Sequence, residues 1–335
     1  MNRFDELGIK YSDLVWDIWQ FYMDHSIKSI FINDLEKCGW NPDLAPKCAI
    51  DFSINFKDKY HEDRALIQPK TVAKICDKLC ENDIMSKMMV SGFNGRDGMT
   101  NFYQTYQNMS EKEYMENKKP FSRYMNNLVY GFSYIYKNNR ENVRPIWTRR
   151  NGKPGNGTCF NSVCGIVTAK HCLEECDELC IDGISADVLK NAKILGLDDI
   201  DLALIIPQND YHWSDKFLIG DCEVLDEILV MGFPNHCGFD RFLTATTGEI
   251  AAIEYSYLAK YKLMLLTGKI KGGNSGGPVL DKKGYVVGIV TEIPAPDGEY
   301  DEFGYGMAIP STYLTKLNDI NNNYNFVNEI SSVES

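Results

Sequence analysis

The sequence predicts a multidomain α+β protein that is mainly α-helical up to about residue 144 and all-β beyond it. In the first part, apolar residues recur at three- and four-residue spacing, which is the period of an amphipathic helix. In the second part, short β-branched runs alternate with glycine, asparagine and aspartate, which form turns between strands. A chain of 335 residues is long enough for two domains, and we expect them at residues 1–144 and 145–322, before a polar tail at 323–335.

The N-terminal part combines helical patterns with a strand–loop–strand segment. We expect helices at 14–35, 72–84 and 120–140, and strands at 88–90 and 102–103 around the glycine-rich loop 91–98. This order of helix, strand, loop and strand resembles a winged helix. Such domains often bind DNA, but residues 72–98 hold four basic and four acidic residues rather than a basic stripe. A protein-contact or sensing module is therefore favoured, with DNA binding and a purely packing extension as alternatives.

The second part reads as a series of short strands followed by one helix. Seven or more strands at this spacing predict an antiparallel barrel or sandwich, and the helix 311–320 closes it. The predicted strands are 163–168, 203–207, 227–233, 248–253, 262–267, 286–291 and 306–309.

Charge and hydropathy narrow the class of protein. Residues 1–144 carry 20 basic and 20 acidic side chains, so the net charge of −12 belongs to residues 145–335. An acidic surface repels nucleic acid, which makes it an unlikely partner. No run of about 18 apolar residues occurs, and the first 20 residues contain no continuous apolar segment, so we expect no membrane span and a cytoplasmic location.

Eleven cysteines, an odd number, predict reduced thiols rather than a disulfide framework. Cys172, Cys176 and Cys180 recur every four residues, as do Cys76 and Cys80, and this spacing predicts one face of a helix. Zinc sites usually show closer pairs. We therefore expect neither a metal nor another cofactor.

The stretch Lys271–Pro278 holds one serine, Ser275, among four glycines and a proline. Glycines on both sides let the backbone present a hydroxyl outward while main-chain N–H groups turn toward one point. A nucleophile beside an oxyanion hole requires this arrangement. The alternative is a glycine-rich hairpin whose serine only caps a turn, and the choice depends on a histidine and a carboxylate elsewhere.

The order of the histidines decides between two hydrolase folds. Gly273–Gly277 matches the GxSxG pattern of α/β-hydrolases, in which the histidine follows the serine. All five histidines, at 25, 61, 171, 212 and 236, precede Ser275, which excludes that fold. His171 ends a β-branched run and Asp201 opens an apolar one, so the order histidine, aspartate, serine predicts a triad. Taken singly, His171 could be structural and Asp201 a strand cap.

Three segments together resemble the signature blocks of trypsin-like serine peptidases, which have the chymotrypsin double β-barrel. They are 167–172, 201–204 and 272–279, and the resemblance covers about residues 145–320. The close spacing of the blocks and the segment 304–311 are most similar to the HtrA-type branch. That branch often carries a PDZ domain, which we do not expect here because 25 residues follow Pro310.

The resemblance implies a role for each site residue. His171 would be the general base and then the acid, Asp201 its orienting carboxylate, and Ser275 the nucleophile. The backbone N–H groups of Gly273 and Ser275 would form the oxyanion hole. Lys170 departs from the alanine usual before the histidine, but a side chain there can point outward.

Asn274 stands where animal digestive zymogens have an aspartate that pairs with a newly freed N-terminus. Clipping near residue 144 is therefore not expected to be required, and residues 1–144 become the place where a protein or ligand could exert control. The primary pocket would lie between 267–272, 290–293 and 304–308. Lys269 and Lys271 there would favour acidic substrates and Glu292 basic ones, so the preference stays open.

We therefore expect a serine endopeptidase that cleaves protein substrates through an acyl-enzyme and is controlled or targeted by its N-terminal domain. One alternative is a catalytically silent, protease-like adaptor. Another is a DNA-binding regulator whose protease domain cleaves the protein itself.

Overall fold

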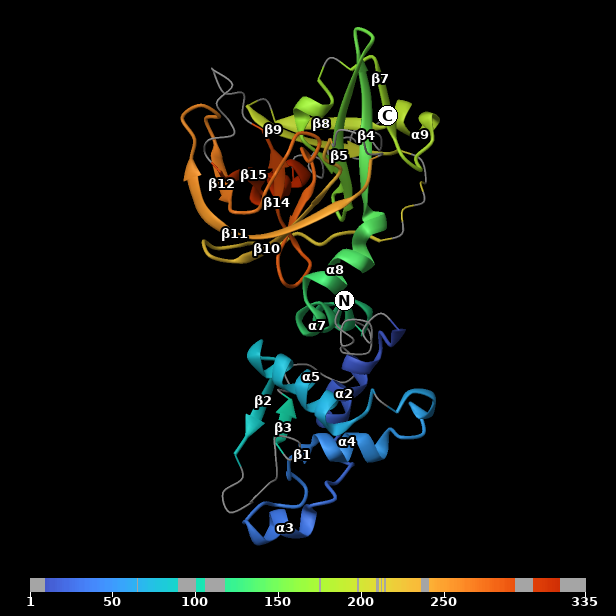
Figure 1. Cartoon of the computed structure of the whole chain (residues 1–335), viewed down its shortest axis with the longest axis vertical. Coiled ribbons are helices and arrows are strands. Elements are labelled where there is room, and N and C mark those ends of the chain that lie inside the picture. The colour runs from blue at the N-terminus through green and yellow to red at the C-terminus, as the bar shows by residue number, and fades with distance from the viewer. Residues whose placement is uncertain are drawn as a thin grey trace, which may run out of the picture. The chain divides into compact units, whose positions relative to one another are not determined.

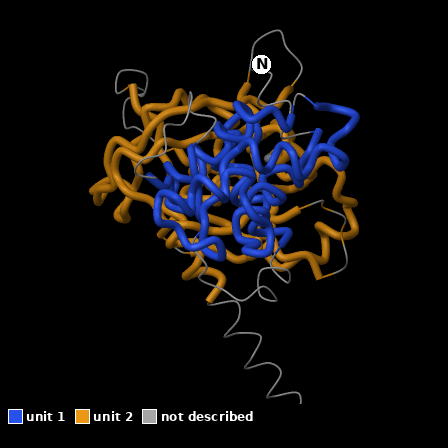
Figure 2. Tube along the Cα trace, turned by 90° about the horizontal axis from the view of Figure 1, so that it is seen from below, with its two compact units in different colours: residues 1–134 blue, residues 135–335 orange. Residues whose placement is uncertain are grey.

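The computed structural model describes residues 10–64, 66–89, 101–105, 118–174, 176–197, 199–208, 211, 213, 215–235, 241–292 and 304–319. The chain divides into two compact units, Met1–Tyr134 and Ile135–Ser335 (Figure 2). We call them unit 1 and unit 2. The expected boundary was at residue 144, ten residues later, so the segment before the first strand of the β part belongs with unit 2.

Unit 1 combines helices with a small antiparallel sheet of order β1-β3-β2 (Figure 1). Its apolar core includes Trp16, Trp19 and Phe21 of the first described helix, which is buried over most of its circumference. The described helices are α2 (Leu14–Met23), α3 (Ile32–Lys37), α4 (Ala49–Asn55), α5 (Pro69–Glu81) and α7 (Lys118–Tyr130). The strands are β1 (Lys47–Cys48), β2 (Met85–Met88) and β3 (Phe102–Thr105).

Two of the three long helices expected in the N-terminal part are divided. The helix expected at 14–35 stops after Met23, where the Asp24 carboxylate accepts the backbone N–H of Ser26 at 2.8 Å and forms a local turn. The helix expected at 120–140 is interrupted by Gly131, whose φ of +72° is incompatible with a continuing helix. It continues as α8 (Phe132–Asn139). The expected glycine-rich loop, 91–98, lies outside the described residues.

Unit 2 consists of two antiparallel β structures (Figure 1). A six-stranded sheet has the order β7-β4-β5-β6-β9-β8, and a closed barrel has the order β10-β11-β12-β15-β14-β13. The sheet strands are β4 (Val143–Arg150), β5 (Lys153–Ser162), β6 (Gly165–Thr168), β7 (Glu178–Ile181), β8 (Lys193–Leu197) and β9 (Ile200–Ile206). The barrel strands are β10 (Glu227–Gly232), β11 (Thr244–Tyr255), β12 (Lys262–Leu266), β13 (Pro278–Leu280), β14 (Val286–Thr291) and β15 (Gly306–Pro310).

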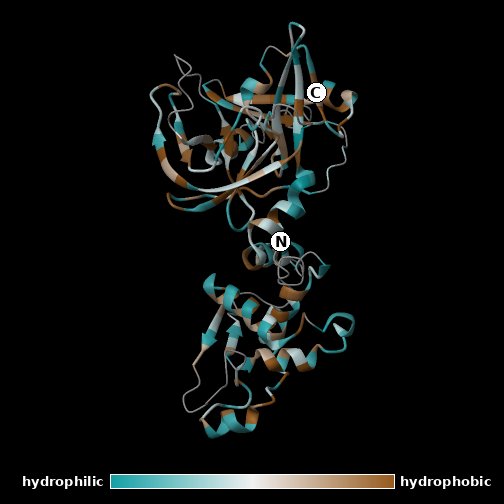
Figure 3. Ribbon diagram, in the orientation of Figure 1, coloured by the Kyte–Doolittle hydropathy of each residue, from teal (hydrophilic) through white to brown (hydrophobic). Residues whose placement is uncertain are grey.

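Each β structure has its own apolar core, and the strands carry brown hydrophobic segments in Figure 3. The barrel interior is filled by side chains such as Ile228, Val230 and Ile250. The sheet packs Ile146, Ile166 and others on one face. A short helix, α9 (Ala186–Lys190), lies between β7 and β8, and residues 312–319 are also helical.

The β4–β5 hairpin is not among the strands expected from the sequence. Only Asn151 and Gly152 form the turn, with φ of +48° and +77°, and Arg150 pairs with Lys153 on either side. Positive φ at both central residues is the condition for the two-residue turn that suits strand twist, and Asn-Gly is its preferred sequence. The hairpin signal was therefore present, and the other glycines and the proline lie within β5.

The four-residue spacing of cysteines predicted a helix face in two segments, and the structure has a helix in only one of them. Cys76 and Cys80 lie on α5, as expected. Cys172 instead ends the 3₁₀ turn η3 (Lys170–Cys172), and Cys180 lies on β7, so no helix face joins them. The ten cysteines within the described ranges are free thiols, and no three metal-binding side chains cluster in those ranges.

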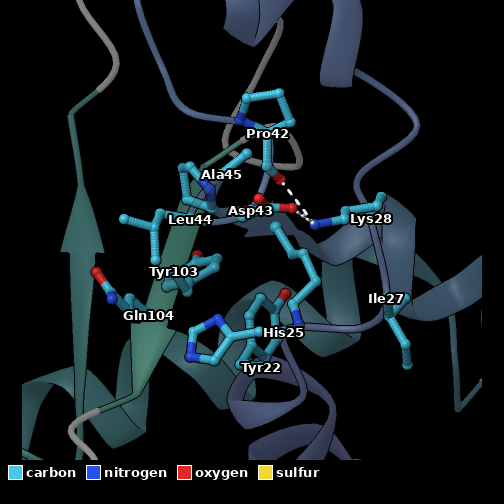
Figure 4. A pocket seen from close by; sticks show the side chains of 12 residues that line it. Tyr22, His25, Ile27, Lys28, Pro42, Asp43, Leu44, Ala45, Tyr103 and Gln104 are labelled. Carbon is cyan, nitrogen blue, oxygen red and sulfur yellow. Dashed lines mark hydrogen bonds and ion pairs between the residues drawn. The ribbon is translucent and has the colours of Figure 1, made fainter.

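A small pocket in unit 1 is lined by Tyr22, His25, Lys47 and Tyr103 (Figure 4). Lys28 lies at its edge, where its ammonium donates to Pro42 O at 3.1 Å and to Asp43 Oδ1 at 2.8 Å. The cavity volume is about 10 Å³, which admits a single water molecule. It is therefore too small to be a ligand site. None of the helices in the described part of the chain has the length and apolar character needed to cross a bilayer.

Candidate active site

The turn that carries Ser275 precedes β13 and is held by its own backbone. The Asn274 N–H donates to Lys271 O at 3.0 Å, and the Gly277 N–H donates to Asn274 O at 2.8 Å. Gly273, the third residue of the Lys271–Asn274 turn, has a φ of +96°. A turn closed by this hydrogen bond with positive φ at its third residue is of type II, in which the central peptide is reversed relative to type I.

Two glycines of this turn are required by close packing as well as by conformation. A Cβ on Gly273 would lie 2.6 Å from Phe233 O, and one on Gly276 would overlap Thr158 O. Gly276 also has a positive φ, of +83°. The turn is thus enclosed by β5 on one side and by the segment after β10 on the other.

His171 and Asp201 meet directly, although they come from different elements. Asp201 lies on β9 and His171 in η3, just after β6, and β6 pairs with β9. The Asp201 carboxylate accepts the His171 backbone N–H on Oδ1 at 2.7 Å and faces Nδ1 of the ring through Oδ2 at 2.7 Å. The two side chains are 36% and 17% exposed, so the imidazole keeps one open side while the carboxylate is largely enclosed.

Ser275 lies near His171 and Asp201, because its backbone contacts Cys172, the residue that follows His171. Ser275 O accepts the Thr158 N–H at 2.8 Å and is 3.7 Å from Cys172 Sγ. The structure therefore brings residues 171, 201 and 275 into one neighbourhood. His25 and His61 belong to unit 1, and positions 212 and 236 lie outside the described residues.

A fourth side chain, Thr291 at the end of β14, completes the surroundings of the carboxylate. Its hydroxyl donates a short hydrogen bond to Asp201 Oδ2, and Thr291 is almost fully buried. Three donors therefore converge on one carboxylate. Sequence reasoning missed Thr291, although a hydroxyl directly after the apolar run Val286–Val290 was a visible signal for a buried polar group.

The surroundings of His171 stabilise the protonated form of its imidazole. Burial by itself lowers the pKa of His171, but hydrogen bonds to Asp201 and Cys172 and the nearby negative charge outweigh it and raise the pKa to about 10. An imidazolium that forms at this position is therefore strongly stabilised by Asp201.

Two backbone donors beside the nucleophile are available. No described residue accepts a hydrogen bond from the N–H of Gly273 or of Ser275, whereas the neighbouring Asn274 and Gly276 N–H groups donate to Lys271 O and Val290 O. The carbonyl of Gly272 is turned away and accepts the Asn235 N–H at 2.9 Å. A pair of unpartnered N–H groups on alternate residues can bind an anionic oxygen.

The segment before the serine presents an apolar side chain rather than a charge to the neighbouring strand. Ile270 packs against Gly306 of β15, where a Cβ would overlap its side chain. Lys269 and Lys271 are exposed, and Glu292 Oε1 would lie 3.7 Å from a Cβ on Gly272. Lys170 reaches away toward β8 and donates to Leu197 O at 3.3 Å.

Comparison with known proteins shows what unit 2 is similar to. Residues 155–289 match the family described as "Trypsin-like peptidase domain". A "Periplasmic pH-dependent serine endoprotease DegQ" from Escherichia coli (strain K12) is 34% identical over 178 residues, which cover 49% of this chain and 36% of that protein. Unit 2 is therefore similar to trypsin-like peptidase domains and to serine endoproteases of the DegP and DegQ kind.

Further similar proteins were found by the same comparisons. A "Probable periplasmic serine endoprotease DegP-like" from Chlamydia muridarum is 29% identical over 220 residues, covering 63% of this chain and 41% of that protein. A solved structure of the HtrA-type protease AlgW with tripeptide matches with 21% identity over 54% of this chain and 60% of that one, with a TM-score of 0.43. The chain spans about two fifths of the length of the two curated relatives.

The comparisons also correct one expectation. A cytoplasmic location is contradicted, because the bacterial relatives are named periplasmic endoproteases. The prediction rested on the first 20 residues, which contain no continuous apolar segment, and on the lack of a run of about 18 apolar residues.

Proposed function

We propose that the protein is a serine endopeptidase in which Ser275, His171 and Asp201 act as the triad. The observation that carries this proposal is the two-point contact of the Asp201 carboxylate with the backbone and ring of His171, beside the glycine turn of Ser275. Binding through Nδ1 assigns the ring proton to that nitrogen and leaves Nε2 free to accept another.

The reaction follows from these positions. Ser275 Oγ attacks the carbonyl carbon of a peptide bond while His171 takes the hydroxyl proton, and the carbonyl oxygen becomes an oxyanion. The N–H groups of Gly273 and Ser275 stabilise that charge. His171 then gives the proton to the departing amine, which leaves an acyl-serine. Water activated by His171 hydrolyses the acyl-serine and restores the serine.

Protein chains are the proposed substrates, and we propose that the primary pocket presents an apolar surface to them. Ile270 covers Gly306, and the lysines on either side of Ile270 are exposed, so a substrate side chain placed there meets a hydrocarbon surface. We expect aliphatic residues to be preferred over charged ones at the cleaved bond. Glu292 lies at the side of Gly272 and would affect the neighbouring substrate position.

Replacing Ser275 with alanine tests the catalytic assignment. Ser275→Ala should abolish cleavage of an unfolded protein substrate and labelling by a fluorophosphonate probe, while thermal unfolding stays close to that of the wild type. Undiminished cleavage by the purified variant would refute the proposal. Failure of the wild-type chain to react with the probe, in lysate as well as in pure form, would favour the silent adaptor.

We propose that unit 1 recruits substrates or regulates the peptidase. The order α5, β2, β3 and the antiparallel pairing of β2 with β3 support a winged-helix-like module. The exposed lysines on α5, Lys70 and Lys74, are accompanied by the acidic Glu81, and Lys78 is paired with Glu81 at 2.5 Å. This mixed surface favours a protein partner. Tight, salt-sensitive binding of the whole chain to duplex DNA would favour nucleic acid instead.

A further inference from the structure

The two N–H groups of the proposed oxyanion hole belong to the peptides 272–273 and 274–275, so their direction depends on what holds the neighbouring carbonyls. Gly272 O is held by the Asn235 N–H at 2.9 Å, and Asn274 O by the Gly277 N–H at 2.8 Å. The peptide between them, 273–274, joins the two donors. A change in its orientation would move both N–H groups together.

Thr158 of β5 holds this central peptide from outside the turn. Its hydroxyl donates to Gly273 O at 2.8 Å and accepts the Phe233 N–H at 2.9 Å. Its own backbone N–H donates to Ser275 O at 2.8 Å. The side chain is fully buried, so water does not compete for these contacts.

Thr158 also contacts the two segments beside the nucleophile turn, the one that begins at Phe233 and the strand that leads to His171. Phe233 begins the segment that ends at Asn235, the residue that orients the Gly272 carbonyl. Thr158 O in turn accepts the Thr168 hydroxyl at 2.8 Å, three residues before His171. One residue thus connects the nucleophile turn, the segment that holds the 272–273 peptide and the strand that leads to the histidine.

We propose that Thr158 is the positioning residue of the oxyanion hole, whose hydroxyl holds the Gly273 carbonyl and thereby keeps the Gly273 and Ser275 N–H groups directed at one point. It touches no substrate and acts through the backbone of the turn. This inference rests on the proposed peptidase activity.

A mainly structural role makes a different prediction from a positioning role. If the hydroxyl only adds stability, its removal lowers the unfolding temperature and leaves the kinetics of the folded enzyme unchanged. If it positions the hole, its removal lowers kcat with little change in KM, because the hole acts on the transition state. Removal of one oxyanion donor costs about 10²–10³-fold in kcat. Loss of the Thr158 hydroxyl would weaken both donors without removing either, so it should cost less, roughly 10–100-fold.

The variants are chosen to separate these outcomes. Thr158→Val keeps the shape and the β-branch but removes the donor and acceptor, whereas Thr158→Ser keeps the hydroxyl and should restore most of the activity. Ser162→Ala is the matched control, since Ser162 is a buried hydroxyl on the same strand that donates to a backbone carbonyl, Gly165 O, at 2.9 Å. It should lose stability without losing kcat.

Inhibitor binding gives a second measurement. A peptide aldehyde forms a tetrahedral adduct whose oxygen occupies the hole, while a product peptide with a free carboxylate does not require the adduct. Thr158→Val should weaken aldehyde binding by about the same factor as kcat. The affinity for an uncleaved peptide is measured with the inactive variant Ser275→Ala, and addition of Thr158→Val to that variant should leave this affinity unchanged. Equal kcat and equal aldehyde affinity in folded Thr158→Val would overturn the inference.

Two further outcomes are distinguishable. If Thr158→Val does not fold, Thr158→Ser and Thr158→Cys form a pair in which a strong hydroxyl donor and acceptor is compared with a weak thiol one, and equal kcat values for the two would overturn the inference. If the wild-type chain shows no turnover that depends on Ser275, the proposed function fails and the positioning role falls with it. A wild type that is active, beside an equally active Thr158→Val, rejects the positioning role alone.

Discussion

Replacement of Asp201 by asparagine is the most demanding test of the site, because the carboxylate accepts hydrogen bonds from three donors and can offer none itself. These are the backbone N–H of His171, its ring Nδ1–H and the Thr291 hydroxyl. An asparagine has one carbonyl oxygen and one NH₂ group. Whichever way the amide is placed, one donor of the wild-type structure faces another donor.

The magnitude follows from the histidine tautomer. If the new NH₂ faces Nδ1, the ring must accept there and carry its proton on Nε2, which can then no longer take a proton from Ser275. If the NH₂ faces the backbone N–H instead, the loop holding His171 is displaced. The first arrangement predicts a fall in kcat of roughly 10⁴-fold, equivalent to about 5.5 kcal/mol of transition-state stabilisation.

The pH dependence provides the second observable. The pKa of His171 is raised to about 10 by its surroundings, Asp201 among them, against an ordinary value of about 6.5. The general base must be neutral, so the acid limb of kcat/KM lies above the ordinary value in the wild type. Removal of the negative charge should move that limb to lower pH while the plateau falls.

The free energy of unfolding should fall as the pH rises, whereas kcat/KM rises with pH along its acid limb. A group whose pKa is raised by folding contributes stability that is complete below pH 6.5 and is lost as the pH rises toward about 10. The wild type should therefore lose more stability over this range than Asp201→Asn does. Hydrolysis of a peptide amide and thermal unfolding, both measured across this range, provide the comparison.

The matched control is Asp199→Asn, which removes the same charge from an exposed position two residues away. It should leave kcat, the acid limb and the stability profile nearly unchanged. Activity of Asp201→Asn within tenfold of the wild type on the plateau of each pH profile, with an unshifted acid limb, would refute the reasoning.

Two further substitutions test the surroundings of the triad. Thr291→Val removes the hydroxyl that donates to the Asp201 carboxylate and should lower the free energy of unfolding, measured in urea, by about 1.5–3 kcal/mol. Its loss of activity should be far smaller than that of Asp201→Asn. A loss of activity as large as that of Asp201→Asn would contradict the supporting role. Gly276→Ala puts a methyl group against Thr158 O at a residue with positive φ, so it should unfold or inactivate the enzyme. The control is Gly284→Ala. Gly284 also has a positive φ but lies in the turn before β14, so this variant should lose stability and retain kcat.

Much of the fold followed from local patterns. The change from helical to β-rich sequence near residue 145, the helix α5 and most barrel strands could be predicted because each depends on the spacing of apolar residues along a short segment. The β4–β5 hairpin was missed because the signal of Asn151-Gly152 was merged with nearby glycines that lie in the strand. The cysteines at 172, 176 and 180 show the limit of spacing alone, since three points with a helical period do not make a helix without an apolar face.

By itself, the sequence determined the order of histidine, aspartate and serine, because the chemical type of a residue and its place beside a β-branched or glycine-rich run can be read locally. Only the tertiary structure decided what surrounds them. Thr291 and Thr158 lie 90 and 115–117 residues from the groups they contact, Asp201 and the turn at Gly273–Ser275. Their contacts depend on strand register and on how the sheet and the barrel strands meet at the turn, and no local pattern specifies a hydrogen bond between segments so distant along the chain.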